Sequence, residues 1–350
     1  MTIAGMKIWR RLRFLLLPFS LIYWLVISLR NLFYDFGIFR IKTLPRPVIS
    51  VGNITAGGTG KTPMVEWIAK FLSQMGKNVA ILSRGYGRRT EGFVLVSDGN
   101  RIFSGADECG DEPFQMALKS VDKGLNWIIA VCENRFEAGR KLLEKFEIDV
   151  FILDDAFQRR DINRDVDILL IDDESVKEFL IPAGLKREPM SSLKRADVVC
   201  VQGLEGWSAF ERYIRGENVV RCVFGYKLLE IRKFFDYILL EKPFEGKKVI
   251  AFSGIGKHKN FLKLLKDNKF LILKDFEFPD HYRYSKDDIK RIIRQMELVG
   301  AEIVLTTEKD YARLYEMKDL KDFPFFYSVI EVEFYSGGEE LKQKILGLVR

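Results

Sequence analysis

Beyond residue 40 the chain alternates short apolar runs with segments in which apolar residues recur at helical spacing. The apolar runs occupy 47–51, 78–82, 127–131, 149–153, 165–171 and 196–201. Runs that are apolar throughout predict strands buried on both faces, which is typical of a parallel sheet covered by helices. Between the first two runs, residues 62–76 predict a helix that buries one face and ends at Gly76. The apolar residues of that face are Val65, Ile68, Ala69, Leu72 and Met75.

The second half of the chain begins with a segment of different character. Residues 221–248 alternate apolar and polar positions without a helical face, so we expect an extended linker there. A second α/β series follows, with apolar runs at 249–256, 270–276, 302–307 and 323–332 and a helical pattern at 286–299. The pattern therefore predicts two α/β domains joined by a strand hinge. The expected boundaries are an N-terminal segment 1–39, a first domain 40–220, a linker 221–248 and a second domain 249–350.

An apolar stretch near the N-terminus belongs to neither series. Residues 14–29 carry no charge and follow a basic cluster formed by Lys7, Arg10, Arg11 and Arg13. As a helix these 16 residues would extend about 24 Å, against roughly 30 Å for the hydrocarbon core of a bilayer. A cleaved signal peptide and a buried core helix are the alternatives. No small-residue cleavage site follows, and Tyr23 and Trp24 suit a membrane interface, so we expect a retained membrane anchor whose N-terminal end stays cytoplasmic.

Composition narrows the classes of partner. The chain has 350 residues and a net charge of +7, which suits anionic partners, although ordinary solubility would produce the same balance. Its basic residues are scattered and no nucleic-acid-binding module is recognisable, so we expect no nucleic-acid partner. Four widely spaced cysteines argue against a zinc site, and two histidines exclude a histidine-rich metal site.

The stretch VGNITAGGTGKTP at 51–63 has the form of a phosphate-binding loop, G-x-x-x-x-G-K-[ST], except that Thr55 stands at the first glycine. It follows an apolar run and precedes the helical segment, as such a loop must. Lys61 would reach the β- and γ-phosphates of ATP, and the Thr62 hydroxyl would hold Mg²⁺. A glycine-rich turn with an incidental lysine is the alternative. We expect nucleotide contacts from Thr55, Gly57, Gly58, Thr59, Gly60, Lys61 and Thr62.

Polar residues follow several of the other apolar runs. Asp154 and Asp155 come directly after the run 149–153, at the edge where an open α/β sheet binds ligands, and we expect one of them to hold Mg²⁺. A helix cap or a turn is the alternative for this pair. Three further stretches, LSRGYGR, CGDEPF and IPAGLKREP, form either surface loops or the rim of an active site. As a rim they would bind the acceptor substrate through Arg84, Tyr86, Arg187 and Glu188.

In their order along the chain, the motifs SVGNITAGGTGKTP, LSRGYGR, GDEP, LDDAFQ, IPAG…REP, RAD and TEKD resemble the tetraacyldisaccharide 4′-kinase family of lipid A biosynthesis. The resemblance extends to about residue 315, and the family's loop also lacks the entrance glycine. It implies a P-loop NTPase-like α/β domain with an N-terminal membrane helix and a smaller α/β domain. It also implies a kinase that uses ATP and Mg²⁺ to phosphorylate the 4′-hydroxyl of an acylated glucosamine disaccharide 1-phosphate, at the cytoplasmic face of the inner membrane. No obligate protein partner is evident.

The resemblance assigns roles to single residues. It implies that Asp111 accepts the proton of the acceptor hydroxyl, paired with His281 from the second domain, and that Lys61 neutralises charge on the phosphoryl group. Without the resemblance, His281 would be interpreted as a surface histidine in a polar loop. The chain departs from the usual family pattern at Ala156, Arg159, Leu185 and Tyr282.

Other P-loop classes fit the motifs less well. A P-loop GTPase would need an N-K-x-D motif, and TEKD at 307–310 has the wrong order and spacing. A membrane-tethered ATPase coupled to a partner protein would share the loop and the anchor, but it would not need a base facing a sugar hydroxyl. The requirement for a glycolipid acceptor distinguishes the lipid kinase from this ATPase.

Overall fold

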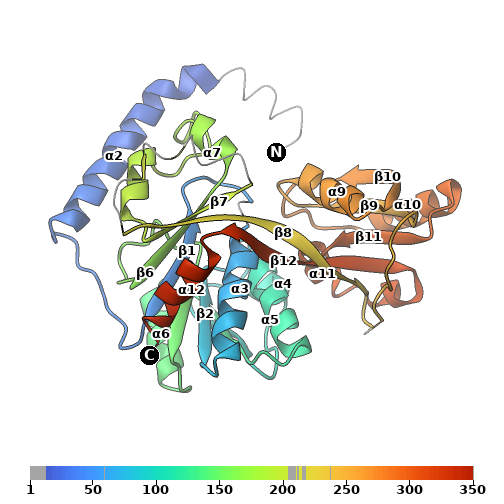
Figure 1. Cartoon of the computed structure of the whole chain (residues 1–350), viewed down its shortest axis with the longest axis horizontal. Coiled ribbons are helices and arrows are strands. Elements are labelled where there is room, and N and C mark those ends of the chain that lie inside the picture. Colours follow the sequence, from blue (N-terminus) through green and yellow to red (C-terminus); the bar gives the residue numbers. More distant parts are fainter. Residues whose placement is uncertain are drawn as a thin grey trace. The chain divides into compact units, whose positions relative to one another are not determined.

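The computed structural model describes residues 13–58, 60–203, 210, 213–214, 218–236 and 238–349. Thr59 of the expected phosphate loop, and Lys7, Arg10 and Arg11 of the basic cluster, lie outside these residues. The chain divides into two compact units, of which the first takes residues up to 225 and those from 332, and the second takes 226–331. Two strands, β8 (Val220–Lys233) and β12 (Phe325–Ser336), connect the units (Figure 1).

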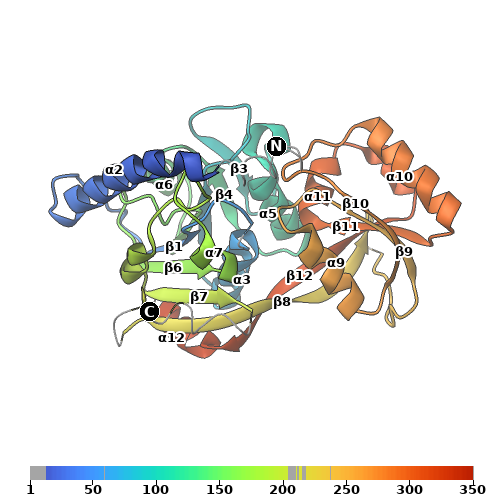
Figure 2. The same cartoon turned by 90° about the horizontal axis from the view of Figure 1, so that it is seen from above.

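The six apolar runs of the first half are six strands of one sheet, which confirms the α/β class. These strands are β1 (Val48–Asn53), β2 (Val79–Ser83), β4 (Ile128–Val131), β5 (Val150–Asp154), β6 (Val166–Ile171) and β7 (Val198–Gln202). In the first unit the strand order is β8-β7-β6-β1-β5-β2-β4-β3, and Figure 2 shows β1, β6, β7 and β8 in succession. All these pairs are parallel except that β3 (Val94–Asp98) lies antiparallel to β4. β3 carries partly exposed residues, so no apolar run marks it in the sequence.

Helices cover both sides of this sheet. They are α3 (Lys61–Gln74), α4 (Ala106–Cys109), α5 (Asp111–Asp122), α6 (Arg135–Leu143), α7 (Asp173–Lys177), the 3₁₀ helix η2 (Met190–Arg195) and α12 (Gly338–Leu346). α3 packs on β1, β5 and β2, and α5 packs on β3 and β4. The expected face of α3 is buried from Val65 to Leu72, whereas Met75 follows the last turn and is exposed, because the helix ends at Gln74.

The C-terminal segment from residue 332 returns to the first unit, whereas the sequence predicts that it belongs to a domain 249–350. Apolar packing accounts for its position. The ring of Phe334 lies 4.9 Å from that of Trp67 on α3, and the Cys222 thiol lies 3.1 Å from the carbonyl oxygen of Gly337. On α12 the side chains of Leu341 and Ile345 are buried. The chain therefore passes between the units twice, rather than once through a single linker.

The second unit is a smaller α/β structure. Its strands are β9 (Lys248–Ser253), β10 (Leu271–Glu277), β11 (Ile303–Thr307) and part of β12, in the order β10-β9-β11-β12 and all parallel. Its helices are α9 (His258–Asp267), α10 (Lys286–Val299), α11 (Glu308–Leu314) and the 3₁₀ helix η4 (Lys318–Asp322). Ser285 caps α10, because its hydroxyl accepts from the Asp288 backbone while the Asp288 carboxylate accepts from the Ser285 backbone.

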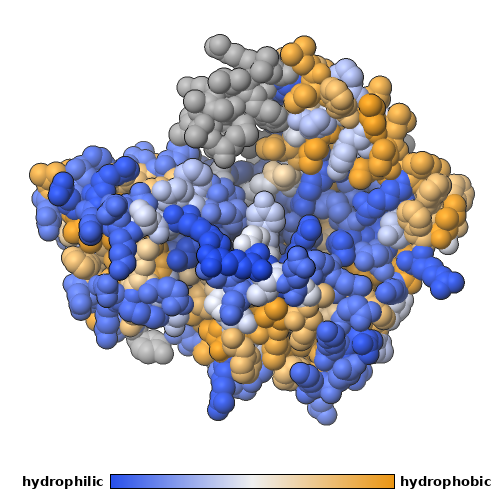
Figure 3. Space-filling model, turned by 180° about the vertical axis from the view of Figure 1, so that it is seen from behind, coloured by the Kyte–Doolittle hydropathy of each residue, from blue (hydrophilic) through white to orange (hydrophobic). Residues whose placement is uncertain are grey.

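The N-terminal apolar stretch is helical. A 3₁₀ turn, η1 (Arg13–Leu16), leads into α2 (Leu17–Asp35), and together they form 23 residues that are long and apolar enough to cross a membrane by length and composition. Hydrophobic side chains gather over α2 at the upper right of Figure 3. Only 6% of its most apolar window is buried. This exposure contradicts the alternative of a buried core helix.

Candidate active site

Three glycines shape the described part of the loop between β1 and α3, where the sequence predicts phosphate contacts. Gly60 caps α3 in the left-handed region at φ 79°, and Gly57 has φ 129°, a value that other residues rarely adopt. A Cβ atom added at Gly57 or Gly58 would meet no atom within 4 Å. The backbone of this loop therefore stands open beside the N-terminus of α3, where backbone N–H groups attract an anion.

Thr55 needs no glycine conformation, because it lies in a short extended bridge. It is buried and pairs antiparallel with Lys186. The backbone N–H of Ala56 donates to the Leu185 carbonyl at 2.7 Å, and that of Arg187 donates to the Ile54 carbonyl at 2.7 Å. The loop entrance is thus held against the segment that carries Arg187 and Glu188. This pairing explains why threonine is acceptable at the first position of the motif.

Two basic side chains converge on Asp155. The Nζ atom of Lys61 lies 3.8 Å from Asp155 Oδ1, and Arg187 donates to both carboxylate oxygens, at 2.7 and 3.0 Å. Arg187 also donates to the side-chain oxygen of Asn53. Burial raises the pKa of Asp155, but Lys61 and Arg187 outweigh burial, so this pKa lies below its ordinary value. Asp155 is therefore an ionised, doubly paired carboxylate.

The pKa of the neighbouring Asp154 is shifted in the opposite direction, upward. This residue is 1% exposed; its Oδ2 accepts from the Ser83 hydroxyl at 3.0 Å, and its Oδ1 is buried with no hydrogen-bond partner in the described chain. Burial, together with the Glu112 and Asp155 carboxylates, raises the pKa of Asp154 to about 7. A buried carboxylate with a free oxygen suits a hard cation such as Mg²⁺. Of the two aspartates, Asp154 is thus the better candidate for a metal ligand.

A magnesium ion at Asp154 would depend on oxygens from outside the protein. Among the described residues no group of three or more His, Cys, Asp and Glu side chains could hold a metal. Mg²⁺ in nucleotide sites usually takes one or two protein ligands and completes its shell with phosphate oxygens and water. Thr62, buried in the first turn of α3, is the second protein ligand that the motif predicts. These residues fit a magnesium–nucleotide complex better than a free metal ion.

Glu188 lies behind Arg187 and is fully buried. Its Oε2 is 2.8 Å from Arg195 NH1 and 3.3 Å from Asn31 Nδ2. Its Oε1 is buried and has no hydrogen-bond partner within the described residues. A buried carboxylate is retained only where it is paired, and Arg195 supplies that charge. Glu188 therefore lies in the protein interior beside the loop, and not on an exposed rim as the sequence suggests.

Asp111 begins α5 and lies beside the loop that carries Arg84 and Tyr86. The two loops approach each other closely at Gly85 and Gly110. A Cβ atom added at Gly85 would lie 2.5 Å from the Cys109 carbonyl oxygen, and one added at Gly110 would lie 2.9 Å from the Tyr86 carbonyl oxygen. Both glycines have positive φ, which bends the two loops together. Arg84 and Tyr86 are exposed there, and Tyr86 is 69% exposed. These residues are accessible to an acceptor, as a rim requires.

His281 belongs to the second unit and has an uncommon backbone. Its φ is +58°, a conformation that costs free energy for most residues. The backbone N–H donates to the Gly254 carbonyl at 3.2 Å and to Asp280 Oδ1 at 3.0 Å, and Nε2 lies 3.4 Å from Lys309 Nζ. Because Asp111 and His281 lie in different units, the pairing between them stays a prediction.

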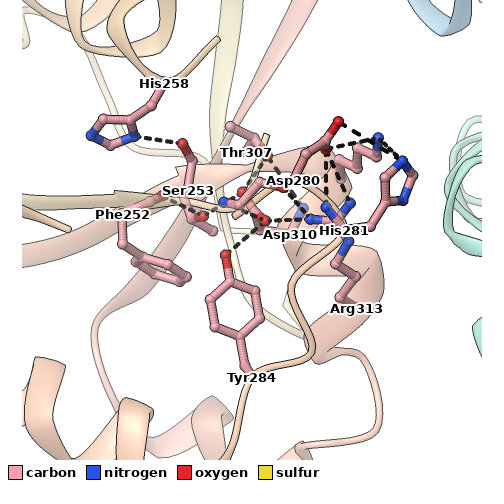
Figure 4. Close-up of polar contacts among 12 residues, drawn as sticks. Phe252, Ser253, His258, Asp280, His281, Tyr284, Thr307, Asp310 and Arg313 are labelled. Atoms are coloured by element: carbon pink, nitrogen blue, oxygen red, sulfur yellow. Dashed lines mark hydrogen bonds and ion pairs between the residues drawn. The ribbon is translucent and has the colours of Figure 1, made fainter. Parts of the chain in front are cut away.

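A buried polar network beneath His281 was not foreseen from the sequence. Figure 4 shows Asp310 at its centre. Asp310 is fully buried and accepts from the Thr307 hydroxyl at 2.6 Å, the Tyr284 hydroxyl at 2.8 Å, the Gly254 N–H at 3.1 Å and Arg313 NH1 at 3.1 Å. Arg313 also donates to the Gly254 carbonyl at 2.6 Å, the same carbonyl that holds the His281 backbone. The TEKD segment therefore supports the strained turn that presents His281.

We expect Asp310→Asn to lower the free energy of unfolding of the second unit by about 3 kcal/mol, because it removes the buried carboxylate that lies 3.1 Å from the buried Arg313 guanidinium and leaves it only the longer ion pair with Asp280 at 4.0 Å. Thermal unfolding followed by circular dichroism measures the change. Asp287→Asn is the matched control, since Asp287 is 92% exposed and pairs with Lys290 at 3.7 Å; the expected cost there is about 0.5 kcal/mol or less. Equal melting temperatures for the two variants would contradict the structural role of Asp310.

The second histidine is not a candidate base. His258 Nδ1 lies 2.6 Å from the Ser253 hydroxyl, and Nε2 lies 3.1 Å from Asp275 Oδ2. This Ser–His–Asp set has the residue types of a nucleophilic triad, yet Ser253 is fully buried and His258 is 3% exposed. A nucleophile must reach its substrate. The set therefore anchors α9 to β9 and β10.

Three further candidate site residues, which no motif marks in the sequence, lie where strands of the first unit end or shortly after. Asn53 ends β1, Ser83 ends β2, and Arg135 begins α6 shortly after β4. Arg135 is buried, and its charge contributes to lowering the pKa of Asp155. A polar residue at the carboxyl end of a buried strand was the available signal, because those ends meet at one edge of a parallel sheet.

The four departures from the family pattern have structural partners in this chain. Ala156 is fully buried, and Arg159 donates to the Glu133 carbonyl at 2.6 Å. Leu185 is exposed, but its backbone carbonyl holds the loop at Ala56. The Tyr282 hydroxyl donates to Asp288 at 3.1 Å. All four positions lie outside the phosphate-loop motif at 51–63, so these departures leave that motif unchanged.

Comparisons with known proteins agree on one family. The LpxK family, described as tetraacyldisaccharide-1-P 4′-kinase, matches residues 12–350. A tetraacyldisaccharide 4′-kinase from Chlorobaculum tepidum is 36% identical, over 96% of this chain and 97% of that protein. A protein of the same name from Aquifex aeolicus is 40% identical, over 87% and 90%. The crystal structure of LpxK from Aquifex aeolicus in complex with ATP is similar to this chain with a TM-score of 0.78 and 34% identity, over 97% of this chain and 100% of that one.

Proposed function

This chain belongs to the tetraacyldisaccharide-1-P 4′-kinase family, and from that premise we propose that it transfers the γ-phosphate of ATP to the 4′-hydroxyl of a tetraacyldisaccharide 1-phosphate, which gives lipid IV-A. One observation carries the proposal. At the ends of β1 and β5, Lys61 and Arg187 converge on Asp155 while the neighbouring Asp154 keeps a buried, unpartnered oxygen. Two basic side chains that can bind phosphate, Lys61 and Arg187, and a carboxylate that can bind a metal ion, Asp154, thus lie beside an open glycine loop. Phosphoryl transfer requires these groups.

The residues divide the work of the reaction. The open loop and Lys61 bind the β- and γ-phosphates, and Thr62 and Asp154 would hold Mg²⁺, which neutralises charge on the phosphates. Asp111 accepts the proton of the 4′-hydroxyl, and His281 pairs with the Asp111 carboxylate and orients it. The bond between the 4′-oxygen and the γ-phosphorus forms as the bond to the leaving oxygen of ADP breaks. Arg84 and Tyr86, exposed beside Asp111, bind the disaccharide headgroup.

The proposed site of action is the cytoplasmic face of the inner membrane. The acceptor is a lipid, and α2 exposes an apolar face on the same unit that carries the phosphate loop. A helix of this kind partitions into a bilayer surface, and a net charge of +7 favours anionic lipid headgroups. ATP is available on the cytoplasmic side, which supports that orientation.

The test is a transfer assay with γ-labelled ATP, Mg²⁺ and a detergent-solubilised acylated disaccharide 1-phosphate. We expect label in the lipid product, and little ATP turnover without the acceptor, because no hydroxyl is then placed in line. The decisive contrast is with a membrane-tethered ATPase, which would release labelled inorganic phosphate at the same rate with and without the glycolipid. That second result would overturn the proposal.

A further inference from the structure

Helix α2 carries a polar stripe opposite its apolar face. Ser20, Tyr23, Arg30 and Asn31 recur at helical spacing, and each hydrogen-bonds to the body of the first unit. The Ser20 hydroxyl donates to the Leu180 carbonyl at 2.8 Å and accepts from the Ala183 N–H at 3.1 Å. Ser20 is 6% exposed within a helix that is otherwise largely open. The stripe is therefore a docking face.

The contacts of this stripe end on the phosphate site. The Tyr23 hydroxyl donates to the Arg187 carbonyl at 2.9 Å, and Asn31 Nδ2 donates to Glu188 Oε2 at 3.3 Å. Arg30 donates to the carbonyl of Gln158, whose side-chain amide donates to the Asn53 carbonyl at 2.8 Å. Three residues of α2 thus each lie one or two hydrogen bonds away from the residues around Asp155.

The Arg187 segment lies between α2 and the phosphate loop. On one side its carbonyl accepts from Tyr23, and on the other its N–H donates to Ile54 at the loop entrance. Its guanidinium meanwhile grips Asp155 with two hydrogen bonds. A bidentate pair of this kind depends on angle as well as distance. Loss of the contact on the α2 side would let the backbone shift and would misalign the guanidinium.

A helix that only anchors the protein in lipid would not need the polar side chains of this stripe. Polar side chains that enter hydrocarbon without hydrogen-bond partners are costly, so a purely lipid-bound helix would be expected to lack them on that stretch. On α2 they are satisfied by the protein when the helix lies along the first unit. The polar face of α2 therefore contacts the segment that carries Arg187 and Glu188, and the apolar face is left to contact lipid.

We propose that α2 is a structural part of the phosphoryl-transfer site, with Tyr23 and Asn31 acting as positioning residues that hold Arg187 and Glu188 in register with the phosphate loop. Catalysis then requires the helix to be docked, and not only to attach the protein to a membrane. This inference rests on the proposed function, because it concerns residues that act on the same phosphates.

The experiment uses the full chain and separates positioning from tethering. Tyr23→Phe removes one hydroxyl and keeps the ring. Tyr34→Phe makes the same change on the same helix, where the ring lies against Arg30 and Arg160. The kcat, the KM for ATP, the melting temperature and the fraction that sediments with anionic phospholipid vesicles are measured for each variant. Ile22→Asn combined with Val26→Asn, on the exposed face, is the positive control for lost sedimentation.

We expect Tyr23→Phe to lower kcat roughly fivefold and the double variant Tyr23→Phe/Asn31→Ala roughly 20-fold or more, as one and two lost hydrogen bonds imply. The KM for ATP, the melting temperature and vesicle sedimentation should match those of the wild type. Tyr34→Phe should match the wild type in all four measurements.

Two results would overturn the inference. One is a kcat for Tyr23→Phe equal to that of Tyr34→Phe. The other is a loss of vesicle sedimentation in Tyr23→Phe that accounts for its loss of activity. Failure of the proposed function is distinguishable from both, because the wild-type chain would then put no label into the glycolipid. A merely structural role for Tyr23 would lower the melting temperature and leave the kcat of the folded protein unchanged.

Discussion

Lys61→Ala is expected to reduce kcat by about 10²–10³-fold, because it removes a fixed positive charge aimed at the migrating phosphoryl group. Lys61 lies at the start of α3, and its Nζ is 3.8 Å from Asp155. The folded protein should tolerate the change, since Arg187 still holds Asp155 through two hydrogen bonds. The loss should therefore appear in kcat at saturating ATP and acceptor, and the melting temperature should change little.

Lys70→Ala is the matched control for this variant. Lys70 lies on the same helix, nine residues after Lys61, and is not part of the phosphate loop. Its removal should leave kcat within about twofold of the wild type, as expected for a surface substitution away from the site. Near-normal activity in Lys61→Ala would mean that the loop after β1 is a glycine-rich turn and does not bind the nucleotide.

The second large effect is expected at Asp111 and His281. Removing a general base typically costs about 10²–10⁴-fold in rate. We expect Asp111→Asn and His281→Asn each to lower kcat within that range while leaving ATP affinity largely intact. Asparagine is chosen at position 281 because it tolerates the left-handed backbone at φ +58°, whereas alanine would add strain. If the two residues act as one unit, the double variant should be scarcely worse than the poorer single variant.

The measurement is the double-variant cycle on kcat at saturating substrates. Asp107→Asn is the control, because Asp107 lies four residues before Asp111 and forms an exposed ion pair with Arg89 at 3.2 Å; its loss should change kcat little. Multiplicative losses would show that Asp111 and His281 act independently. In that case Asp111 alone would remain the base, and His281 would be assigned to binding the acceptor.

Local pattern was enough for much of the first unit. The apolar runs 47–51 and 149–153 predict β1 and β5, and their burial on both faces predicts a parallel sheet. Lys61 and Asp155, which come after these strands, lie 3.8 Å apart although 94 positions separate them. This was predictable because the carboxyl ends of parallel strands share one edge of the sheet. Periodicity and strand direction together therefore locate the phosphate site.

The division of labour between Asp154 and Asp155 was decided by the tertiary structure. Two adjacent aspartates are equivalent in the sequence, but Asp155 is the one that pairs with Lys61 and Arg187. The other is buried beside Ser83 and Glu112, so its pKa is raised to about 7. Which carboxylate is paired and which is left for a cation depends on residues from four other segments.

Three further features were likewise decided by contacts between distant segments. Thr55 is acceptable in the phosphate loop because Lys186 pairs with it, and the buried Asp310 carboxylate accepts hydrogen bonds from the distant Tyr284 hydroxyl and Gly254 N–H. The polar stripe of α2 can be recognised as a docking face only from its contact with the Arg187 segment. The sequence by itself determined the fully apolar strands, the helix faces, the glycine loop and the family, since periodicity and motifs are local properties of the chain. Only the tertiary structure decided which polar groups satisfy one another, because a hydrogen bond between residues 164 positions apart, as from Tyr23 to Arg187, leaves no local pattern in the sequence.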